Sequence, residues 1–441
     1  MEDKILLKEK LAYSAGDVGC NFIYALVSSF LMIYYTNNVK LGAAAVGTLI
    51  LIARLLDGVT DLTMGAIIDK TNTRWGKTRP WILFSAPLMC IGLILLFNVP
   101  MGFSQNGKLI YAYITYIFLM SIIYTIANLS YCTLLSRISD NIQERSVLSS
   151  IRFFFVIILT ITLSMITNPL VEKYGWTKIS IIYGILAFIC LFITFAFTKE
   201  RCNNDKQEKM ELKKGFASLA KNKYFFFLAI MFVITYTDLG VYSGSMLYYT
   251  TYVIHDANLM GMLTLSFYGP MVIVFVFLPK LISMFGKWKI MMVGLLLKLI
   301  GSIIMALDPS SFQFAVAGSI VKGAGMAPIL VGIFAIVADV VDYGEWKTGI
   351  RVDGLINSCV SFGMKLGGGI GTAILGWILA WGKYNGSAKV QVESALTSIK
   401  ISFVYSGIVL AIAALVVMYF INIDKVAGKM KSELNAKTIS D

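Results

Sequence analysis

Two aspartates, Asp57 and Asp61, stand four residues apart within a long apolar stretch of the sequence. At this spacing on a helix, two side chains project from the same face, one turn apart. Two carboxylates that close repel each other when both are ionised, which favours binding of a proton or of a hard cation through several oxygen atoms. The pair therefore predicts a site for H⁺ or for a metal cation such as Na⁺, and Thr60 with a hydroxyl from a neighbouring helix could complete a sodium shell.

Arg54 lies one helical turn before this pair. Its guanidinium group is suitably placed to compensate the carboxylates when the cation leaves. A competing interpretation is a static ion-pair network that holds this helix against its neighbours. Such a network needs only one carboxylate per arginine and leaves an excess negative charge, so we favour the cation site.

Further polar residues interrupt apolar stretches of the first half of the chain, and they could form a substrate site. A sugar needs paired hydrogen-bond donors and acceptors, and an aromatic face on which its ring can stack. A single buried asparagine more often makes a hydrogen bond that holds two helices together. Convergence with an arginine and with the acidic pair favours the substrate site. Its candidate residues are Asp17, Asn21, Tyr124, Asn128, Tyr131 and Arg152.

The second half of the chain carries a lysine and an acidic run in apolar surroundings. Lys365 needs a counter-charge there, and the glycines beside it allow the close approach and kinking expected of a moving helix. For Asp339 and Asp342 we favour pairing with basic residues of the cytoplasmic face, as a gate, over contact with the substrate. The predicted charge network comprises Arg54, Asp339, Asp342 and Arg351.

These residues must be positioned by membrane-spanning helices. The chain has 441 residues, of which 57% are apolar and 14% charged, more apolar surface than a soluble core of this length needs. A helix crosses the hydrocarbon with about 20 residues, whereas barrel strands would show short alternating segments. We expect twelve helices, at about residues 11–36, 41–68, 80–99, 109–136, 148–170, 176–198, 224–253, 259–279, 290–307, 311–342, 352–382 and 397–422.

One long polar stretch, residues 199–223, divides six predicted helices from six. Two six-helix bundles joined by a cytoplasmic linker are typical of the major facilitator architecture. The predicted parts are therefore an N-terminal bundle at 1–198, a linker at 199–223, a C-terminal bundle at 224–423 and a cytoplasmic tail at 424–441. An all-α membrane protein with two pseudo-symmetric bundles is the expected fold class.

Lysine and arginine gather in the loops on the side of the two termini. By the positive-inside rule both termini are cytoplasmic, in the inner or plasma membrane of the cell. This asymmetry explains the net charge of +13, so no nucleic-acid partner is expected. The sequence contains no Walker loop, HExxH or CxxC motif, and no GxSxG pattern with a histidine partner, so an enzyme is not expected. No cofactor is expected beyond the coupling ion.

Three stretches resemble the glycoside-pentoside-hexuronide cation symporters, the family of the melibiose and glucuronide permeases. They are residues 53–61, ARLLDGVTD, residues 72–81, NTRWGKTRPW, and residues 336–345, IVADVVDYGE. The likeness covers nearly the whole chain. It implies a cation-coupled symporter that imports a sugar by alternating access. The implied partners are a glycoside, pentoside or hexuronide, a monovalent cation and the lipid bilayer, and the implied working form is a monomer.

The resemblance also implies roles for individual residues. Asp57, Asp61 and Thr125 look like the family's cation site, and Lys365 looks like its lysine near both sites. Asn21, Tyr124, Asn128 and Arg152 look like its sugar site.

This sequence departs from the melibiose permease at several of these positions. Asn21 and Asn128 stand where that protein has aspartates, which makes the pocket more positive and would suit an anionic sugar, with neutral glycosides and pentosides left open. Thr60 replaces an asparagine, which bears on sodium specificity. Cys132 replaces a tryptophan, with Tyr131 as the expected substitute for ring stacking. A sodium-coupled lipid or lysolipid carrier of the same architecture and an uncoupled sugar facilitator remain the alternatives.

Overall fold

The computed structural model describes residues 5–202, 218–349, 352–388 and 390–422. Within these ranges all regular secondary-structure elements are helices. Eleven of the helical segments are long and apolar enough to cross a membrane. Most of the predicted linker and nearly all of the predicted tail lie outside the described residues.

One of the eleven helices contains two crossings. α6 (Ile142–Phe197) is broken at Gly175, whose φ of 78° and ψ of 160° are not helical. The hydroxyl groups of Thr167 and Tyr183, eight residues on either side of the break, lie 3.0 Å apart. In a straight helix sixteen residues span about 24 Å, so the two arms of α6 run antiparallel. The described residues therefore supply the twelve crossings that the sequence predicts.

The chain divides into two compact units. Unit 1 comprises Met1–Gln207, Thr250–Gly261 and Gly376–Leu396, and unit 2 comprises Glu208–Tyr249, Met262–Leu375 and Thr397–Asp441. The helices of the first half are α1 (Leu7–Ile33), α2 (Ala43–Lys70), α3 (Arg79–Leu96), α4 (Gln105–Tyr116), α5 (Tyr124–Ile138) and α6. A π-helical turn, Ile117–Ile123, joins α4 to α5 in one continuous span.

The second half contributes α8 (Lys223–Tyr252), α9 (Met260–Phe285), α10 (Lys287–Leu307), α11 (Phe312–Thr348) and α12 (Asp353–Trp381), followed by α13 (Glu393–Lys400) and α14 (Ser406–Phe420). The C-terminal ends of α8 and α12 belong to unit 1, whereas the predicted boundaries placed both helices wholly in the C-terminal bundle. Asn37 explains it, because its amide donates to the Tyr252 hydroxyl at 2.7 Å and its carbonyl oxygen accepts from the Tyr384 hydroxyl at 2.6 Å.

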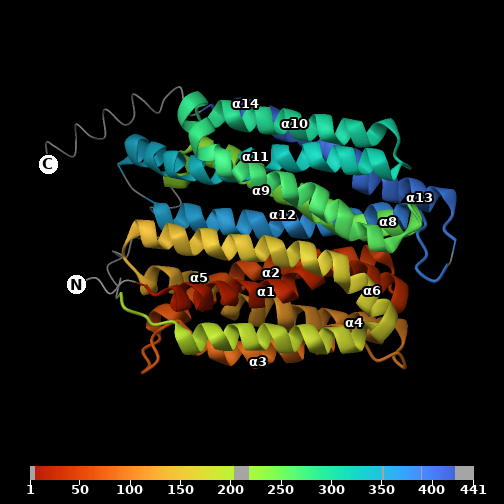
Figure 1. The fold of residues 1–441 in the computed structure, drawn as a ribbon, viewed down its shortest axis with the longest axis horizontal. Coiled ribbons are helices and arrows are strands. Elements are labelled where there is room, and N and C mark those ends of the chain that lie inside the picture. Colours follow the sequence, from red (N-terminus) through yellow and green to blue (C-terminus); the bar gives the residue numbers. More distant parts are fainter. Residues whose placement is uncertain (1–4, 203–217, 350–351, 389, 423–441) are drawn as a thin grey trace, which may run out of the picture. The chain divides into compact units, whose positions relative to one another are not determined.

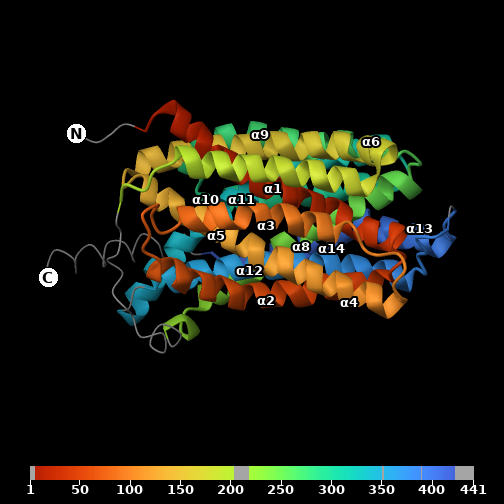
Figure 2. The same ribbon diagram turned by 90° about the horizontal axis from the view of Figure 1, so that it is seen from below.

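In unit 1, α1 and α3 pack against α6, and α2 packs against α5, with the long helices running side by side (Figures 1 and 2). Gly16 on α1 makes one of these contacts possible, since a β-carbon there would lie 2.7 Å from the ring of Tyr131. Large apolar side chains such as Val59 and Leu62 remain 62% and 68% exposed. Lipid is the solvent that such a surface requires.

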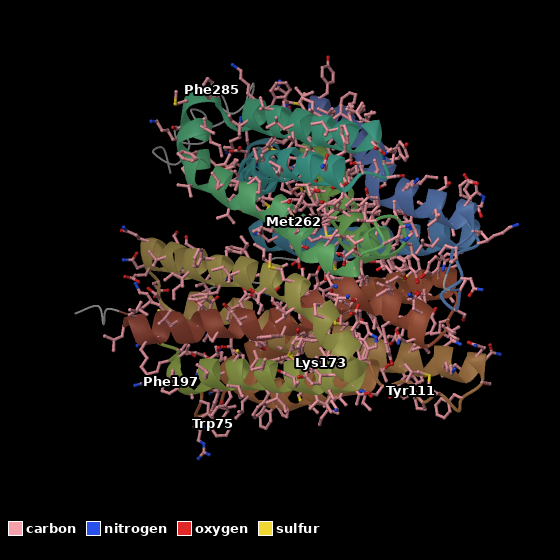
Figure 3. The ribbon with its side chains drawn as sticks, turned by 45° about the vertical axis from the view of Figure 1, so that its right-hand side comes forward. Trp75, Tyr111, Lys173, Phe197, Met262 and Phe285 are labelled. Atoms are coloured by element: carbon pink, nitrogen blue, oxygen red, sulfur yellow. The ribbon has the colours of Figure 1, made fainter. Side chains whose placement is uncertain are left out.

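The loop after α2 is held at one end of unit 1 by a single carboxylate. Glu200, just beyond α6, accepts hydrogen bonds from the backbone N–H groups of Lys77, Thr78 and Arg79 and from the Thr78 hydroxyl. Figure 3 shows Trp75 of this loop and Phe197 of α6 at the same end, with Tyr111 toward the other. Burial opposes ionisation of Glu200, but these donors outweigh it and hold the pKa of the carboxyl below its ordinary value.

Candidate functional site: a carboxylate pair beside a tyrosine-arginine cluster

The first carboxylate of the pair lies inside unit 1 with one oxygen bound and one oxygen free. Asp57 is 1% exposed, and its Oδ2 accepts a hydrogen bond of 3.1 Å from Arg54 Nη1. Its Oδ1 is buried without a hydrogen-bond partner. Arg54, 8% exposed, is oriented by the ring of Tyr24, whose centroid lies 5.9 Å from the guanidinium carbon. The arginine therefore engages only half of the Asp57 carboxylate.

The helix that contains Thr125 is placed against α2 by a hydrogen bond one turn earlier. The Ser121 hydroxyl donates to the backbone oxygen of Ala53 at 2.9 Å. One crossing, α3, separates these helices in the chain, so they run in the same direction, and one further turn along each leads to Thr125 and Asp57. The Thr125 hydroxyl is buried and has no hydrogen-bond partner. Two unsatisfied oxygen atoms thus lie at the same level of two adjoining helices.

The other two residues of the predicted cation site are less enclosed. Asp61 lies one turn beyond Asp57 on α2 and is half-buried. The Thr60 hydroxyl donates to the backbone oxygen of Asp57 at 3.1 Å, which leaves its lone pairs available. In the described part of the chain, no group of three or more His, Cys, Asp and Glu side chains is arranged to hold a metal ion.

A second polar cluster joins α1 to α6. Asp17 Oδ2 lies 3.7 Å from Arg152 Nε, and Asp17 Oδ1 accepts a hydrogen bond of 3.1 Å from the Asn21 amide. The side chains of Asp17 and Arg152 are 14% and 16% exposed, so both keep some accessible surface. The structure therefore brings together three of the predicted substrate-site residues, with their charges in balance.

Tyr13 is a member of this cluster that the sequence reasoning missed. Its hydroxyl accepts from Arg152 Nη1 at 3.5 Å, and its ring stacks on that of Tyr131 with centroids 4.7 Å apart. The signal was present in the sequence, because Tyr13, Asp17 and Asn21 follow one another at intervals of four on one helix face. Tyr131 is fully buried and 5.7 Å from the Arg152 guanidinium carbon, so its ring supports Tyr13 and Arg152 in this conformation.

The other two predicted residues of α5 make separate contacts. Tyr124 is buried, with its ring tilted against Tyr24 at 6.1 Å. Asn128 is half-buried, and its side-chain oxygen lies 4.0 Å from the sulfur of Cys132, which is itself exposed. Cys132, at the position where the melibiose permease has a tryptophan, is therefore accessible.

The predicted residues of the second half lie in unit 2. Lys365 is half-buried on α12, and Asp342 is half-buried near the end of α11. Asp339 is buried and forms an ion pair with Lys287 at the start of α10. The partner of Asp339 is thus a basic residue of its own unit, and the gating role stays a prediction. Arg351 lies outside the described residues.

Known proteins resemble this chain along nearly its whole length. Residues 12–425 match the family described as MFS/sugar transport protein. The isoprimeverose transporter of Lactiplantibacillus pentosus is 33% identical over 97% of this chain and 91% of its own length. In Escherichia coli K12, the inner membrane symporter YicJ is 30% identical over 91% of this chain and 88% of its own, and a glucuronide carrier protein homolog is 29% identical over 95% and 93%.

Solved structures share the fold at low sequence identity. A mutant of the nucleoside transporter NupG matches with a TM-score of 0.70 and 15% identity, over 93% of this chain and 99% of its own. A bacterial homolog of the human lysosomal transporter Spinster matches with a TM-score of 0.65 and 13% identity, over 94% and 95%. These matches confirm the predicted twelve-helix major facilitator fold.

The predicted resemblance to the glycoside-pentoside-hexuronide cation symporters is confirmed by these relatives, which are membrane transporters and not enzymes. The chain therefore belongs to the MFS/sugar transport protein family.

Proposed function

We propose that this protein is a cation-coupled symporter that imports a sugar by alternating access. Asp57, Asp61 and Thr125, with Thr60, would hold the cation. The sugar site in unit 1 would comprise Asp17, Asn21, Tyr124, Asn128, Tyr131 and Arg152, and a role of Lys365 of unit 2 in transport stays a prediction. A relative named as an isoprimeverose transporter and another named as an inner membrane symporter support the reaction class.

The observation that carries the proposal is the pair of unsatisfied oxygen atoms, Asp57 Oδ1 and Thr125 Oγ1. A buried polar atom without a partner costs about 1–3 kcal/mol. A proton on Asp57 could donate to Thr125, and a sodium ion could accept a lone pair from each oxygen. Either ligand would remove the cost, and Arg54 on the other carboxylate oxygen would stabilise the empty state.

The arrangement around Arg152 favours a neutral sugar. Arg152 has Asp17 as its counter-charge, and their 3.7 Å separation leaves donors and acceptors available to sugar hydroxyl groups. A hexuronide would have to compete with Asp17 for the guanidinium. We therefore favour a neutral glycoside or pentoside over the anionic sugar that the change from aspartate to Asn21 and Asn128 suggests.

Coupling would follow from the neighbouring positions of the two sites within unit 1. A cation at Asp57 would order α2 against α5, whose Tyr131 supports Arg152 and Tyr13 in the sugar cluster. Thermodynamic reciprocity then requires that the sugar tighten cation binding by the same factor. Both termini would face the cytoplasm across the cell's inner or plasma membrane, as the distribution of lysine and arginine predicts.

Uptake into proteoliposomes, with proton and sodium gradients imposed separately, tests the proposal. We expect a labelled neutral disaccharide to accumulate above its external concentration under one gradient, with unlabelled glucuronide a weak competitor. Equilibration without accumulation under both gradients would show an uncoupled facilitator. Competition by a lysolipid in place of sugars would identify the lipid-carrier alternative.

A further inference from the structure

Unit 2 buries three charged side chains from three helices, apart from the residues described above. Asp238 lies on α8, Lys298 on α10 and Lys322 on α11, the last two helices lying side by side (Figure 1). Lys322 donates a hydrogen bond of 3.4 Å to Asp238 Oδ1, and Lys298 Nζ lies 3.2 Å from Asp238 Oδ2. All three side chains are 1% exposed. Charged side chains so deeply buried in a membrane protein indicate a function. These three belong neither to the proposed cation site nor to the proposed sugar site.

The two lysines differ in what surrounds them. Lys322 Nζ lies 4.2 Å from the centroid of the Tyr242 ring, whose π face stabilises a cation. Asp238 Oδ2 accepts no hydrogen bond, so Lys298 is close to the carboxylate without the alignment of a hydrogen bond.

The other groups around the cluster are neutral. The Tyr242 hydroxyl is hydrogen bonded to Ser319 at 2.8 Å, and Tyr249 and Tyr268 also face Tyr242. Tyrosine is neutral at physiological pH. From the last transmembrane helix come the ring of Phe403, stacked on Tyr242, and the backbone of Gly407 near Lys322. Among the residues that the structure describes, Asp238 is the only carboxylate paired with either lysine.

Charge counting gives this cluster a specific chemistry. With every group ionised it would hold two ammonium groups and one carboxylate, a net positive charge sealed from water. An uncompensated charge in such surroundings is costly, and removing one proton from the cluster avoids that cost. The cluster is electrically balanced when one of the two lysines is a neutral amine.

We propose that Asp238, Lys298 and Lys322 form a proton-binding site in which the two lysines together hold one proton fewer than they would in water. One of the two lysines is a neutral amine, and its lone pair takes a proton from water when a helix movement admits solvent to the cluster. The site is separate from Asp57 and Asp61, and it stands whether or not those residues bind the coupling cation.

Counting protons during unfolding tests the site. The full chain in detergent, weakly buffered near pH 7.5, is unfolded with dodecyl sulfate while an indicator dye reports the proton change. Every lysine of the unfolded chain is protonated at this pH, since an ordinary lysine has a pKa of about 10.4. The wild type should therefore take up about one proton more than Lys298→Met or Lys322→Met, each of which leaves one lysine paired with Asp238.

Lys289→Met is the matched control, because Lys289 lies on the same helix as Lys298 and is exposed to solvent. Its proton uptake should equal that of the wild type. Asp238→Asn, which leaves neither lysine with a counter-charge, should raise the uptake by about one further proton. Equal uptake by the wild type and Lys298→Met, or by the wild type and Asp238→Asn, would overturn the proposal, and either variant suffices if the other does not fold.

Discussion

Arg54 donates a hydrogen bond to one oxygen of Asp57, three residues further along the same helix, and leaves the other oxygen of that carboxylate buried without a partner. A static ion pair in a low-dielectric interior is stable only when its remaining lone pairs are satisfied. The incomplete pairing is what a site that alternates between an arginine and a cation requires.

Replacing Asp57 with asparagine should abolish accumulation driven by a cation gradient while leaving exchange of sugar across the membrane intact. The amide keeps the shape of the side chain but removes the charge that binds the cation. Gradient-driven uptake and sugar exchange, measured in the same proteoliposomes, check this. Asp69→Asn, at the exposed end of α2, is the control and should accumulate sugar normally. Wild-type accumulation by Asp57→Asn would rule out the proposed cation site.

Thr125→Val should weaken cation dependence with little effect on the fold. Valine fills the same volume, and the hydroxyl that it removes makes no hydrogen bond in the protein, so stability should change by less than about 1 kcal/mol. The cation concentration for half-maximal sugar uptake should rise about tenfold, the equivalent of one ligand worth about 1.4 kcal/mol. Thr133→Val on the same helix removes a hydroxyl bonded to a backbone oxygen and should leave that concentration unchanged. An unaltered cation dependence in Thr125→Val would exclude this hydroxyl from the site.

Tyr13→Phe should lower sugar affinity by a few-fold without changing cation dependence. The phenylalanine ring can keep the stacking on Tyr131, whereas the hydroxyl that accepts from Arg152 is lost. This hydrogen bond is long, at 3.5 Å, so its loss should cost less than the roughly 1.5–3 kcal/mol of a well-formed hydrogen bond to a charged group. Equilibrium binding of labelled sugar checks the affinity, with Tyr183→Phe on α6 as a control for loss of a buried hydroxyl. Unchanged binding would limit Tyr13 to a packing role.

Glu200→Gln should destabilise the end of unit 1 at neutral pH and flatten the acid limb of the stability profile. The folded state holds the pKa of Glu200 below its ordinary 4.5, so its contribution is complete above that value and is lost as the pH falls through the folded pKa. We expect a loss of about 1–3 kcal/mol at pH 7, because a neutral amide accepts weaker hydrogen bonds from the loop. Thermal unfolding in detergent between about pH 3 and 7 checks this, because the window of the effect lies below pH 4.5. Parallel profiles for the variant and the wild type would contradict it.

Gly323→Ala should destabilise unit 2 strongly. A β-carbon at Gly323 on α11 would lie 2.0 Å from the backbone oxygen of Phe267 on α9, and a backbone atom cannot rotate away. Overpacking of this kind costs about 1–3 kcal/mol or more. Gly269→Ala on α9 is the matched control, since its β-carbon would meet only Leu265, at 3.8 Å. Equal melting temperatures for the two variants would show that α9 and α11 can separate without cost.

Hydrophobic patterning is a local property, and for that reason the sequence alone determined the twelve crossings and the all-α membrane class. Even the break in α6 was visible as the gap between two predicted helices near Gly175. The spacing of Asp57 and Asp61 on one helix face was equally local. The motif at residues 53–61 also supported the family resemblance, because the spacing of residues along the sequence fixes which side chains share a helix face.

Contacts between helices depend on the register and rotation of both helices, which no single segment encodes, so they became visible only in the folded chain. The tertiary structure placed Ser121 against Ala53 and so brought Thr125 to the level of Asp57. It also paired Asp17 with Arg152, so the positive charge of Arg152 has a counter-charge that the sequence alone did not identify. The two lysines that share Asp238 are 24 residues apart on different helices, and their common partner exists only after those helices pack.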